Sequence, residues 1–282
     1  MKLFIGINIM KIKFNEYFAM NFSKIIKDQV RAILPKTVVE ALILLKYFRV
    51  KEIPDSGVYI GCVENKKGIE IGGPSILFKT ALPLYQKIRS LDGVNFSGET
   101  IWEGKISSGL GYNYFGNKRG VQFISDAIDL AKITDDTYDF LLSSNCLEHI
   151  ANPLKALIEW RRVLKSDGSL ILVLPNKDNN FDRNRPTVTF EHLLQDFNCK
   201  TTEYDLTHLD EILSCHDLSL DPMAGDIEAF KKRCLVNFDN RALHHHVFDL
   251  NVMKAMLEYC GLEVIKMGKT DNDLFSLSAK RG

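Results

Sequence analysis

Acid–base side chains closely follow an apolar run that is typical of a buried strand. The run covers residues 138–143, and Glu148 and His149 come soon after its end. Because histidine titrates near neutral pH, His149 could orient a substrate or accept a proton from it. The alternative is a hydrogen-bonded histidine with a structural role. His192 and then His244 are the next candidates for a base.

A second chemical signal is a pair of glycines after the predicted strand 68–71. Gly72 and Gly73 would let the backbone approach a ligand closely, and a helix beginning beyond them would present free N–H groups to an anion. The longer G-x-G-x-x-G pattern of dinucleotide-binding proteins is missing. This disfavours a nicotinamide-dependent oxidoreductase, since that class should also carry an acidic residue about twenty positions further on.

The polar stretch 176–186 contains two neighbouring arginines and an acid. Asp182, Arg183 and Arg185 are candidate substrate-binding residues, because paired guanidinium groups suit an anion such as a carboxylate or a phosphorylated sugar. A solvated loop held by salt bridges explains the same residues equally well.

Three consecutive histidines, His244 to His246, suggest a metal site at first sight. In an extended chain successive side chains point to opposite sides, so only His244 and His246 could share an ion. The sequence offers no evident further ligand. We therefore predict no metal and expect one of these histidines to face the active site.

The elements that must position these residues alternate between strand and helix patterns. Such alternation predicts an α/β fold, a doubly wound Rossmann-like sheet with helices on both faces. Ligands bind such sheets at the carboxyl ends of the strands, where the glycines and His149 would lie. The predicted strands are residues 68–71, 94–96, 121–124, 138–143, 169–174, 262–267 and 274–279.

The predicted domain plan has two parts. Residues 1–55 form an N-terminal helical extension that ends at the turn-forming stretch 54–57. Residues 56–282 form the main domain, with a core at 68–175 and a substrate-side insertion at 176–245. Helices are predicted at 154–164, where Asn152 caps the first turn, and at 190–197, 206–218 and 250–260.

Composition excludes some classes of protein. The chain has 282 residues, with 36 basic and 36 acidic side chains, so its zero net charge argues against a nucleic-acid partner. Six scattered cysteines without a C-x-x-C pair predict reduced thiols and a cytoplasmic location. No apolar run is long enough to predict an integral membrane segment. The oligomeric state is not predicted.

Several motifs occur in an order that resembles class I S-adenosylmethionine-dependent methyltransferases. The Glu70-Ile71-Gly72-Gly73 turn resembles their first motif, and residues 93–97 and 121–130 resemble the second and third strands. The block 138–175, which contains NCLEHIANP, WRRVL and ILVLP, is similar to the type 11 methyltransferase subgroup. The resemblance implies S-adenosylmethionine as cofactor.

The resemblance also implies which residues hold that cofactor. Asp126 and the N–H of Ala127 would read the adenine edge, although Asp126 could instead cap a surface turn. Asn145 would line the methionine part or the methyl-transfer opening. The implied cofactor-binding set is Glu70, Gly72, Gly73, Asn95, Asp126, Ala127 and Asn145.

One departure from the family concerns Asn95. The family usually has an acid there to bind both ribose hydroxyls, and an amide offers one acceptor oxygen without a charge. Pro74 and Ser75 also alter the glycine turn. The predicted function is in-line methyl transfer to a small molecule or a glycan precursor. The alternative is a non-catalytic binding or assembly protein that keeps the fold.

Overall fold

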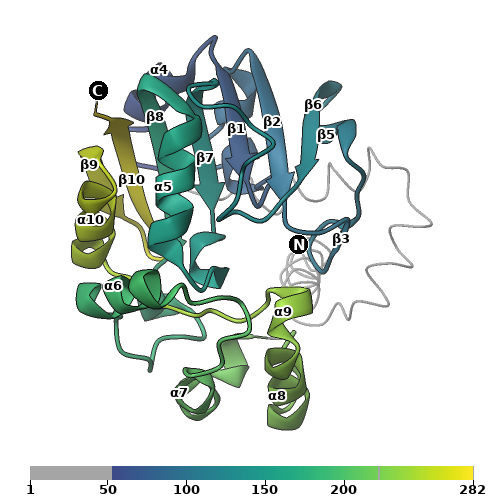
Figure 1. Cartoon of the computed structure of the whole chain (residues 1–282), viewed down its shortest axis with the longest axis vertical. Coiled ribbons are helices and arrows are strands. Elements are labelled where there is room, and N and C mark those ends of the chain that lie inside the picture. Colours follow the sequence, from purple (N-terminus) through teal and green to yellow (C-terminus); the bar gives the residue numbers. More distant parts are fainter. Residues whose placement is uncertain (1–52, 222, 282) are drawn as a thin grey trace, which may run out of the picture. The chain divides into compact units, whose positions relative to one another are not determined.

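The computed structural model describes residues 53–221 and 223–281 (Figure 1). The predicted N-terminal extension, residues 1–55, lies outside these residues except for its last three. The predicted boundary at 54–57 coincides with the start of the first described helix, α4, Ser56–Val63.

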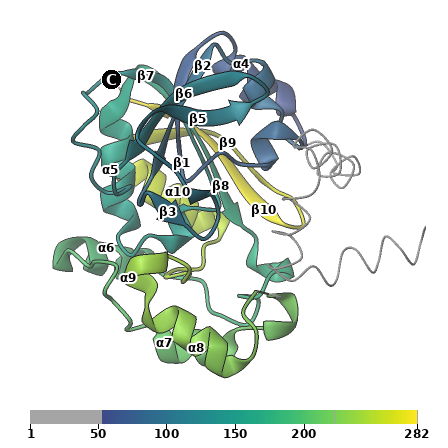
Figure 2. The same cartoon turned by 90° about the vertical axis from the view of Figure 1, so that its right-hand side faces the viewer.

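A sheet of eight strands forms the centre of the described domain (Figures 1 and 2). Its order is β5-β6-β2-β1-β7-β8-β10-β9, and the five strands from β6 to β8 run parallel. β5 and β10 pair antiparallel with their neighbours, and β9 is antiparallel to β10. The predicted α/β fold class is confirmed, and each predicted strand is present.

The strands and helices have the following bounds. The sheet contains β1 Lys67–Ile71, β2 Ser90–Asn95, β5 Gly109–Phe115, β6 Lys118–Ile124, β7 Tyr138–Ser144, β8 Leu164–Pro175, β9 Leu262–Lys269 and β10 Asp273–Lys280, and β3 Glu99–Thr100 pairs with β4 Gly104–Lys105. The remaining helices are α5 Pro153–Val163, α6 Phe190–Cys199, α7 Leu209–Cys215, α8 Ile227–Leu235, α9 Asn237–Asn240 and α10 Leu250–Tyr259. Short 3-10 helices cover Leu77–Lys79, Leu84–Gln86, Leu147–His149, Lys177–Asn179 and Leu218–Leu220.

Alternating side chains of the central strands build a core on each face of the sheet. Leu141 and Leu172 pack with α5 and α10, whereas Leu142 and Val173 pack with α4 and the 3-10 turns after β1. Strand side chains alternate between faces, so each buried strand must be apolar along its whole length. This explains why the predicted strands are mostly apolar and do not alternate strictly between apolar and polar residues.

Helix α5 begins as its sequence predicts. The side chain of Asn152 accepts a hydrogen bond from Lys155 N at 3.1 Å, and Pro153 occupies the first turn. Trp160 is buried on its inner face and donates from Nε1 to Ala127 O at 3.0 Å. The helix therefore holds the loop after β6, where the candidate adenine-binding residues lie.

The connection from β1 to β2 differs from the prediction. No α-helix lies between β1 and β2, all of whose connecting residues the structure describes. The chain makes two 3-10 turns there, Leu77–Lys79 and Leu84–Gln86. Pro74 and Pro83 each remove a backbone donor and so disfavour a regular helix in this stretch. The expectation of a helix N-terminus facing an anion is therefore wrong. The 3-10 turns, α4 and the tyrosines of β5 cover this face of the sheet instead.

The insertion after β8 lies beyond the carboxyl edge of the sheet. Figure 1 shows α6, α7, α8 and α9 below the arrowheads of β1, β2 and β7. The chain then returns through residues 241–249, which form neither helix nor strand, to α10. This path carries the three histidines back past the sheet edge.

Candidate active site

A cavity of about 510 Å³ lies at the carboxyl edge of the parallel strands. Its size is within the range of ligand pockets, roughly 300–1,000 Å³. The residues that line it come from the ends of β1, β2, β7 and β8, the loop after β6, the start of β10 and the insertion. Segments far apart in the sequence thus form one site.

The glycine turn forms part of the cavity wall and has no room for side chains. Gly72 has φ +79°, and a Cβ built there would lie 2.7 Å from Cys146 Sγ. A Cβ on Gly73 would lie 2.2 Å from Glu70 Cδ and 2.3 Å from Tyr112 Oη. Only glycine keeps the backbone this close to its neighbours. The turn is a surface that a ligand can approach closely.

Glu70 packs against the side of this turn that faces away from the cavity, and it does not line the cavity. The hydroxyl groups of Tyr85 and Tyr112 each donate to Oε2 at 2.6 Å, and Ser75 N donates to Oε1 at 3.0 Å. Burial raises the pKa of Glu70 to about 7, although these hydrogen bonds oppose the shift. Glu70 thereby fixes Ser75, which does line the cavity.

Asn95 joins the end of β2 to the glycine turn. Its Nδ2 donates to Gly73 O at 3.1 Å, and the residue lines the cavity. Since the amide nitrogen is used in this way, Oδ1 is the atom that can accept from a ligand hydroxyl. The site therefore offers one acceptor here, as the sequence predicts.

Asp126 lies at the cavity with both oxygens engaged. Ile128 N donates to Oδ1 at 3.2 Å, and Arg241 Nη2 donates to Oδ2 at 2.9 Å. Arg241 also bonds Glu203 Oε1 at 3.1 Å, and its guanidinium lies 5.2 Å from the Phe96 ring centre. The arginine thus ties the insertion to the loop after β6 beside the proposed adenine position.

The end of β7 places Asn145 at the centre of the cavity wall. Its backbone has φ 48°, a conformation that asparagine tolerates better than most residues. Its side chain bonds the carboxyl of Asp273, whose pKa burial raises to about 6 against the effect of this bond. The pair closes the cavity between β7 and β10.

A compact acid–histidine cluster, Glu148, His149 and His244, lines the same cavity. Nδ1 of His149 lies 3.2 Å from Leu243 O, so this nitrogen carries the hydrogen and Nε2 is left to accept. Burial holds the pKa of His149 well below its ordinary value. His149 is therefore neutral near pH 7.

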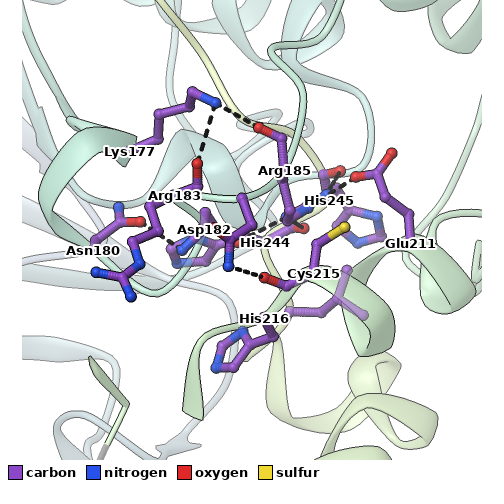
Figure 3. Close-up of polar contacts among 12 residues, drawn as sticks. Lys177, Asn180, Asp182, Arg183, Arg185, Glu211, Cys215, His216, His244 and His245 are labelled. Carbon is purple, nitrogen blue, oxygen red and sulfur yellow. Dashed lines mark hydrogen bonds and ion pairs between the residues drawn. The ribbon is translucent and has the colours of Figure 1, made fainter. Parts of the chain in front are cut away.

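His244 belongs to an Asp–His pair (Figure 3). Its Nδ1 lies 2.6 Å from Asp182 Oδ2. Burial alone would lower the pKa of His244, but the Asp182 carboxylate outweighs it and raises the pKa. The pKa of Asp182 is lowered to about 2, because the effects of His244 and Arg185 outweigh the opposite effect of burial. Asp182 thus orients His244 with Nδ1 protonated.

The arginines of the polar segment bind protein groups. Arg185 is only 2% exposed, and its guanidinium contacts Asp182 Oδ1 at 3.1 Å, Glu211 Oε1 at 2.9 Å and His244 O at 2.9 Å (Figure 3). Arg183 pairs with Asp217 Oδ2 at 2.5 Å on the surface. Asp182, Arg183 and Arg185 do not line the cavity, so the anion-binding prediction has no support from their geometry.

The other predicted site residues separate into two groups. Those that line the cavity are Gly72, Asn95, Asp126, Ala127, Asn145, His149 and His244. Glu70 and Gly73 lie behind its wall. His192 lies in a different cluster, with its Nε2 3.0 Å from His208 Nε2. His244 and His246 do not meet at a shared ion, because His246 joins the cluster of His192.

Some residues of the cavity carry no sequence signal for this position. Arg241 is 115 residues from Asp126, and Trp102 comes from the turn between β3 and β4, where no motif precedes it. Trp102 is 49% exposed and packs edge-on against His149 with ring centres 5.3 Å apart. Glu148 sits in the NCLEHI motif, but its direction into the cavity depends on the turn after β7.

Comparisons with known proteins agree with this arrangement of motifs. A family model described as a methyltransferase domain matches residues 90–172. An uncharacterized protein of Methanocaldococcus jannaschii is 56% identical over 45 residues, which are 16% of this chain and 20% of that protein. The match therefore spans only a fifth of that relative's length.

Solved structures of S-adenosylmethionine-dependent methyltransferases are similar to the chain at low identity. The protein from Mesorhizobium loti is 10% identical, with 80% of this chain and 96% of that chain covered and a TM-score of 0.47. The protein from Methanosarcina mazei is 15% identical, with 82% and 99% covered and a TM-score of 0.45. The protein from Aquifex aeolicus is 14% identical, with 80% and 89% covered and a TM-score of 0.44.

The family-model match assigns residues 90–172 to a methyltransferase domain, and the order of the motifs agrees with the class I S-adenosylmethionine-dependent methyltransferases of type 11 that the sequence resembles. Domains of this family belong to enzymes that use S-adenosylmethionine, which agrees with the predicted enzyme class and cofactor. The predicted family is confirmed. In the part of the chain that the structure describes, no helix has the length and apolar character needed to cross a membrane. The cytoplasmic location stays a prediction.

Proposed function

We propose that this chain transfers a methyl group from S-adenosylmethionine to a hydroxyl group of a small molecule or a glycan precursor. The observation that carries the proposal is that one cavity contains both the motif residues Gly72, Asn95 and Asp126 and the Asp-held His244. A cofactor site and a base on the acceptor side are the two parts that methyl transfer to a hydroxyl requires.

The residues of the cavity suit the parts of the cofactor. Gly72 allows close approach of the methionine part, Asn95 Oδ1 can accept from a ribose hydroxyl, and Asp126 can accept from the adenine amine. The cofactor, when bound, supplies a methyl group on a positively charged sulfur that keeps the bonding electrons. The residues of the wall hold donor and acceptor in line and keep water from the reaction.

His244 receives the acceptor's proton in this proposal. When the acceptor hydroxyl is methylated, its proton would move to His244 Nε2. Asp182 keeps Nδ1 protonated, so that Nε2 is the basic nitrogen, and it stabilises the charged ring that results. This ranks His244 above His149 as the base, in contrast to the order expected from sequence.

The acceptor side favours hydroxyl donors over anions. Glu148 is buried, and neither of its carboxyl oxygens has a hydrogen-bond partner among the described residues. In the ionised form, such oxygens accept from hydroxyl or amine groups and repel carboxylates and phosphates. Trp102 and Phe181 add aromatic walls. A neutral acceptor with several hydroxyl groups, as in a sugar, meets these demands.

Calorimetry with S-adenosylmethionine, followed by a product screen, tests the proposal. We expect saturable binding and, with mixtures of hydroxylated metabolites and sugar precursors, products heavier by one methyl group. Isotope-labelled cofactor identifies the transferred carbon. A folded protein that binds no S-adenosylmethionine would overturn the proposal and favour the non-catalytic alternative. Binding together with methylation of amines but not of hydroxyls would overturn the role given to His244.

A further inference from the structure

A second cluster of histidines lies outside the cavity, in the insertion. His192 and Asp196 are four residues apart on α6, His208 precedes the first turn of α7, and His246 lies in the segment before α10. None of the four lines the cavity described above. Three chain segments therefore bring ligand-type side chains to one point.

We propose that His192, Asp196, His208 and His246 bind one Zn²⁺ ion in a tetrahedral structural site. Imidazole nitrogen and carboxylate oxygen are ordinary zinc ligands, and four protein ligands are typical of structural sites. A Mg²⁺ or Ca²⁺ ion would instead require a set of oxygens. The ligand set thus excludes Mg²⁺ and Ca²⁺, and four protein ligands in a tetrahedral arrangement favour zinc among the transition metals.

The distances within the cluster suit a tetrahedral ion. Ligands at a zinc–nitrogen distance of about 2.0–2.1 Å lie about 3.3 Å from one another at the corners of a tetrahedron. The observed separations are 3.0 Å for His192 Nε2 to His208 Nε2, 3.3 Å for His192 Nε2 to Asp196 Oδ2 and 3.5 Å for His246 Nε2 to Asp196 Oδ2. These three of the six edges lie close to the ideal value, and the ligand atoms of the three histidines all lie within 4.8 Å of one another, so the histidines must move together to complete the site.

The carboxylate of Asp196 is oriented by one hydrogen bond and has one oxygen left for a cation. Thr201 Oγ1 donates to Oδ1 at 3.0 Å, which orients the group, while Oδ2 is buried and has no hydrogen-bond partner among the described residues. A buried carboxylate oxygen without a donor costs free energy unless a cation or donor meets it. Outer-shell hydrogen bonds of the Thr201 kind are a regular feature of metal sites.

A cluster held only by hydrogen bonds is the alternative to a metal. His246 Nε2 lies 3.3 Å from Ala151 O and could donate there, and His192 could share one hydrogen with His208. This arrangement leaves Asp196 Oδ2 and His246 Nδ1 without a hydrogen-bond partner among the described residues, and a neutral His192 and His246 would give Asp196 Oδ2 no positive charge. A metal satisfies Asp196 directly. His192, whose side chain is 32% exposed, gives the ion a route from solvent.

The proposed ion would stabilise the segment that carries the base. His244 contacts Asp182, His245 contacts Glu203 Oε2 at 3.1 Å, and His246 joins the metal cluster. Three consecutive histidines thus go to three different partners. Fixing His246 fixes the backbone two residues from His244. The prediction of no metal considered His244 and His246 as one pair and missed the His-x-x-x-Asp pattern on α6.

Metal analysis of the purified full-length chain tests the proposal. We expect one equivalent of zinc in the protein as isolated, its removal by a chelator, and its return when Zn²⁺ alone is added. The apo protein with Co²⁺ should show the visible absorption of a tetrahedral ion. A wild-type protein that holds no zinc, or shows octahedral cobalt absorption, would overturn the site.

Variants locate the ion within the chain. His208→Asn and Asp196→Asn should each lower zinc affinity at least about 100-fold, and Thr201→Val should lower it about 10- to 100-fold through the outer shell. Glu191→Gln, next to His192 on α6, is the matched control and should bind as the wild type does. If a ligand variant fails to fold, Thr201→Val and the wild-type cobalt spectrum still decide the matter. Zinc lost on His149→Asn but kept in His208→Asn would place the ion in the cavity and overturn the proposal.

Discussion

His244 Nδ1 lies 2.6 Å from Asp182 Oδ2, and this contact joins the polar segment after β8 to the histidine run before α10. Asp182→Asn removes the charge that raises the pKa of His244 and can offer its amide where Nδ1–H must donate. We expect kcat to fall at least about tenfold, since base catalysis contributes about 10²–10⁴-fold. The acid limb of the pH–rate profile should move to lower pH, because the histidine then loses its proton more easily.

Asp217→Asn is the matched control for this change. Asp217 pairs with Arg183 outside the cavity, so the same chemical replacement should leave the profile unchanged. An Asp182→Asn enzyme with the wild-type rate and pH profile would show that His244 is not the base. An equal loss in both variants would indicate a general effect on folding.

Asp126 gives a second test, on cofactor affinity. Asp126→Ala removes the proposed acceptor for the adenine amine, and calorimetry should show a Kd for S-adenosylmethionine raised at least about tenfold, the cost of one hydrogen bond to a charged group. Glu203 of the insertion still accepts from Ala151 N of the core at 2.9 Å, so the insertion stays attached. Asp129→Ala, three residues along the same loop, should bind normally. An unchanged Kd for Asp126→Ala would exclude the adenine role.

The strands and the main helices of this fold are predictable because their signals are local. Short, mostly apolar runs predict β1, β2, β6, β7 and β8, and the Asn152–Pro153 start predicts α5. The strand β5 is different, since only Tyr112 and Tyr114 in it are fully buried and the rest is mostly exposed. An edge strand of this kind has a weak hydrophobic pattern in the sequence, because it pairs with only one neighbouring strand and buries only one face.

The candidate site is predictable only in its cofactor half. Gly72, Asn95 and Asp126 each follow a recognisable strand, so their place at the sheet edge follows from the fold. Arg185 and His244 lie in the insertion, where no repeating pattern determines which side chains meet. A free arginine and a buried, paired arginine look the same in sequence. The burial of Arg185 against Asp182 and Glu211 therefore depends on tertiary packing, which the local sequence does not reveal.

The glycine turn provides a stability and binding test. Gly73→Ala places a Cβ 2.2 Å from Glu70 Cδ and 2.3 Å from Tyr112 Oη, so the turn or the buried carboxyl must move. We expect a loss of stability of about 1–3 kcal/mol, as for overpacked cores, and weaker cofactor binding. Gly57→Ala in α4 meets nothing within 4 Å and should be neutral or slightly stabilising. Thermal unfolding with and without S-adenosylmethionine measures both effects; equal behaviour of the two variants would contradict the close packing at Gly73.

Glu148 gives a prediction about pH and stability. Burial raises its pKa to about 7 from an ordinary 4.5, so the folded protein binds a proton that the unfolded chain releases. Its ionisation therefore lowers stability as pH rises from about 4.5 through 7, and the cost is complete only above that range. Glu148→Gln removes the charge and should raise the free energy of unfolding at pH 8 by up to about 3 kcal/mol, at 1.36 kcal/mol for each pKa unit.

At pH 5 the same Glu148→Gln variant should match the wild type, because the folded-state carboxyl is then protonated and resembles the amide. Urea unfolding at both pH values measures the difference. Glu258→Gln is the control, since Glu258 is exposed and paired with Lys254 at 2.5 Å on α10, and an exposed pair contributes little at either pH. A gain for Glu148→Gln that is equal at pH 5 and pH 8 would mean that packing, not charge, limits stability at this position. No gain at pH 8 would mean that the carboxylate finds a partner in solution, and the acceptor role proposed for its free oxygens would fall with it.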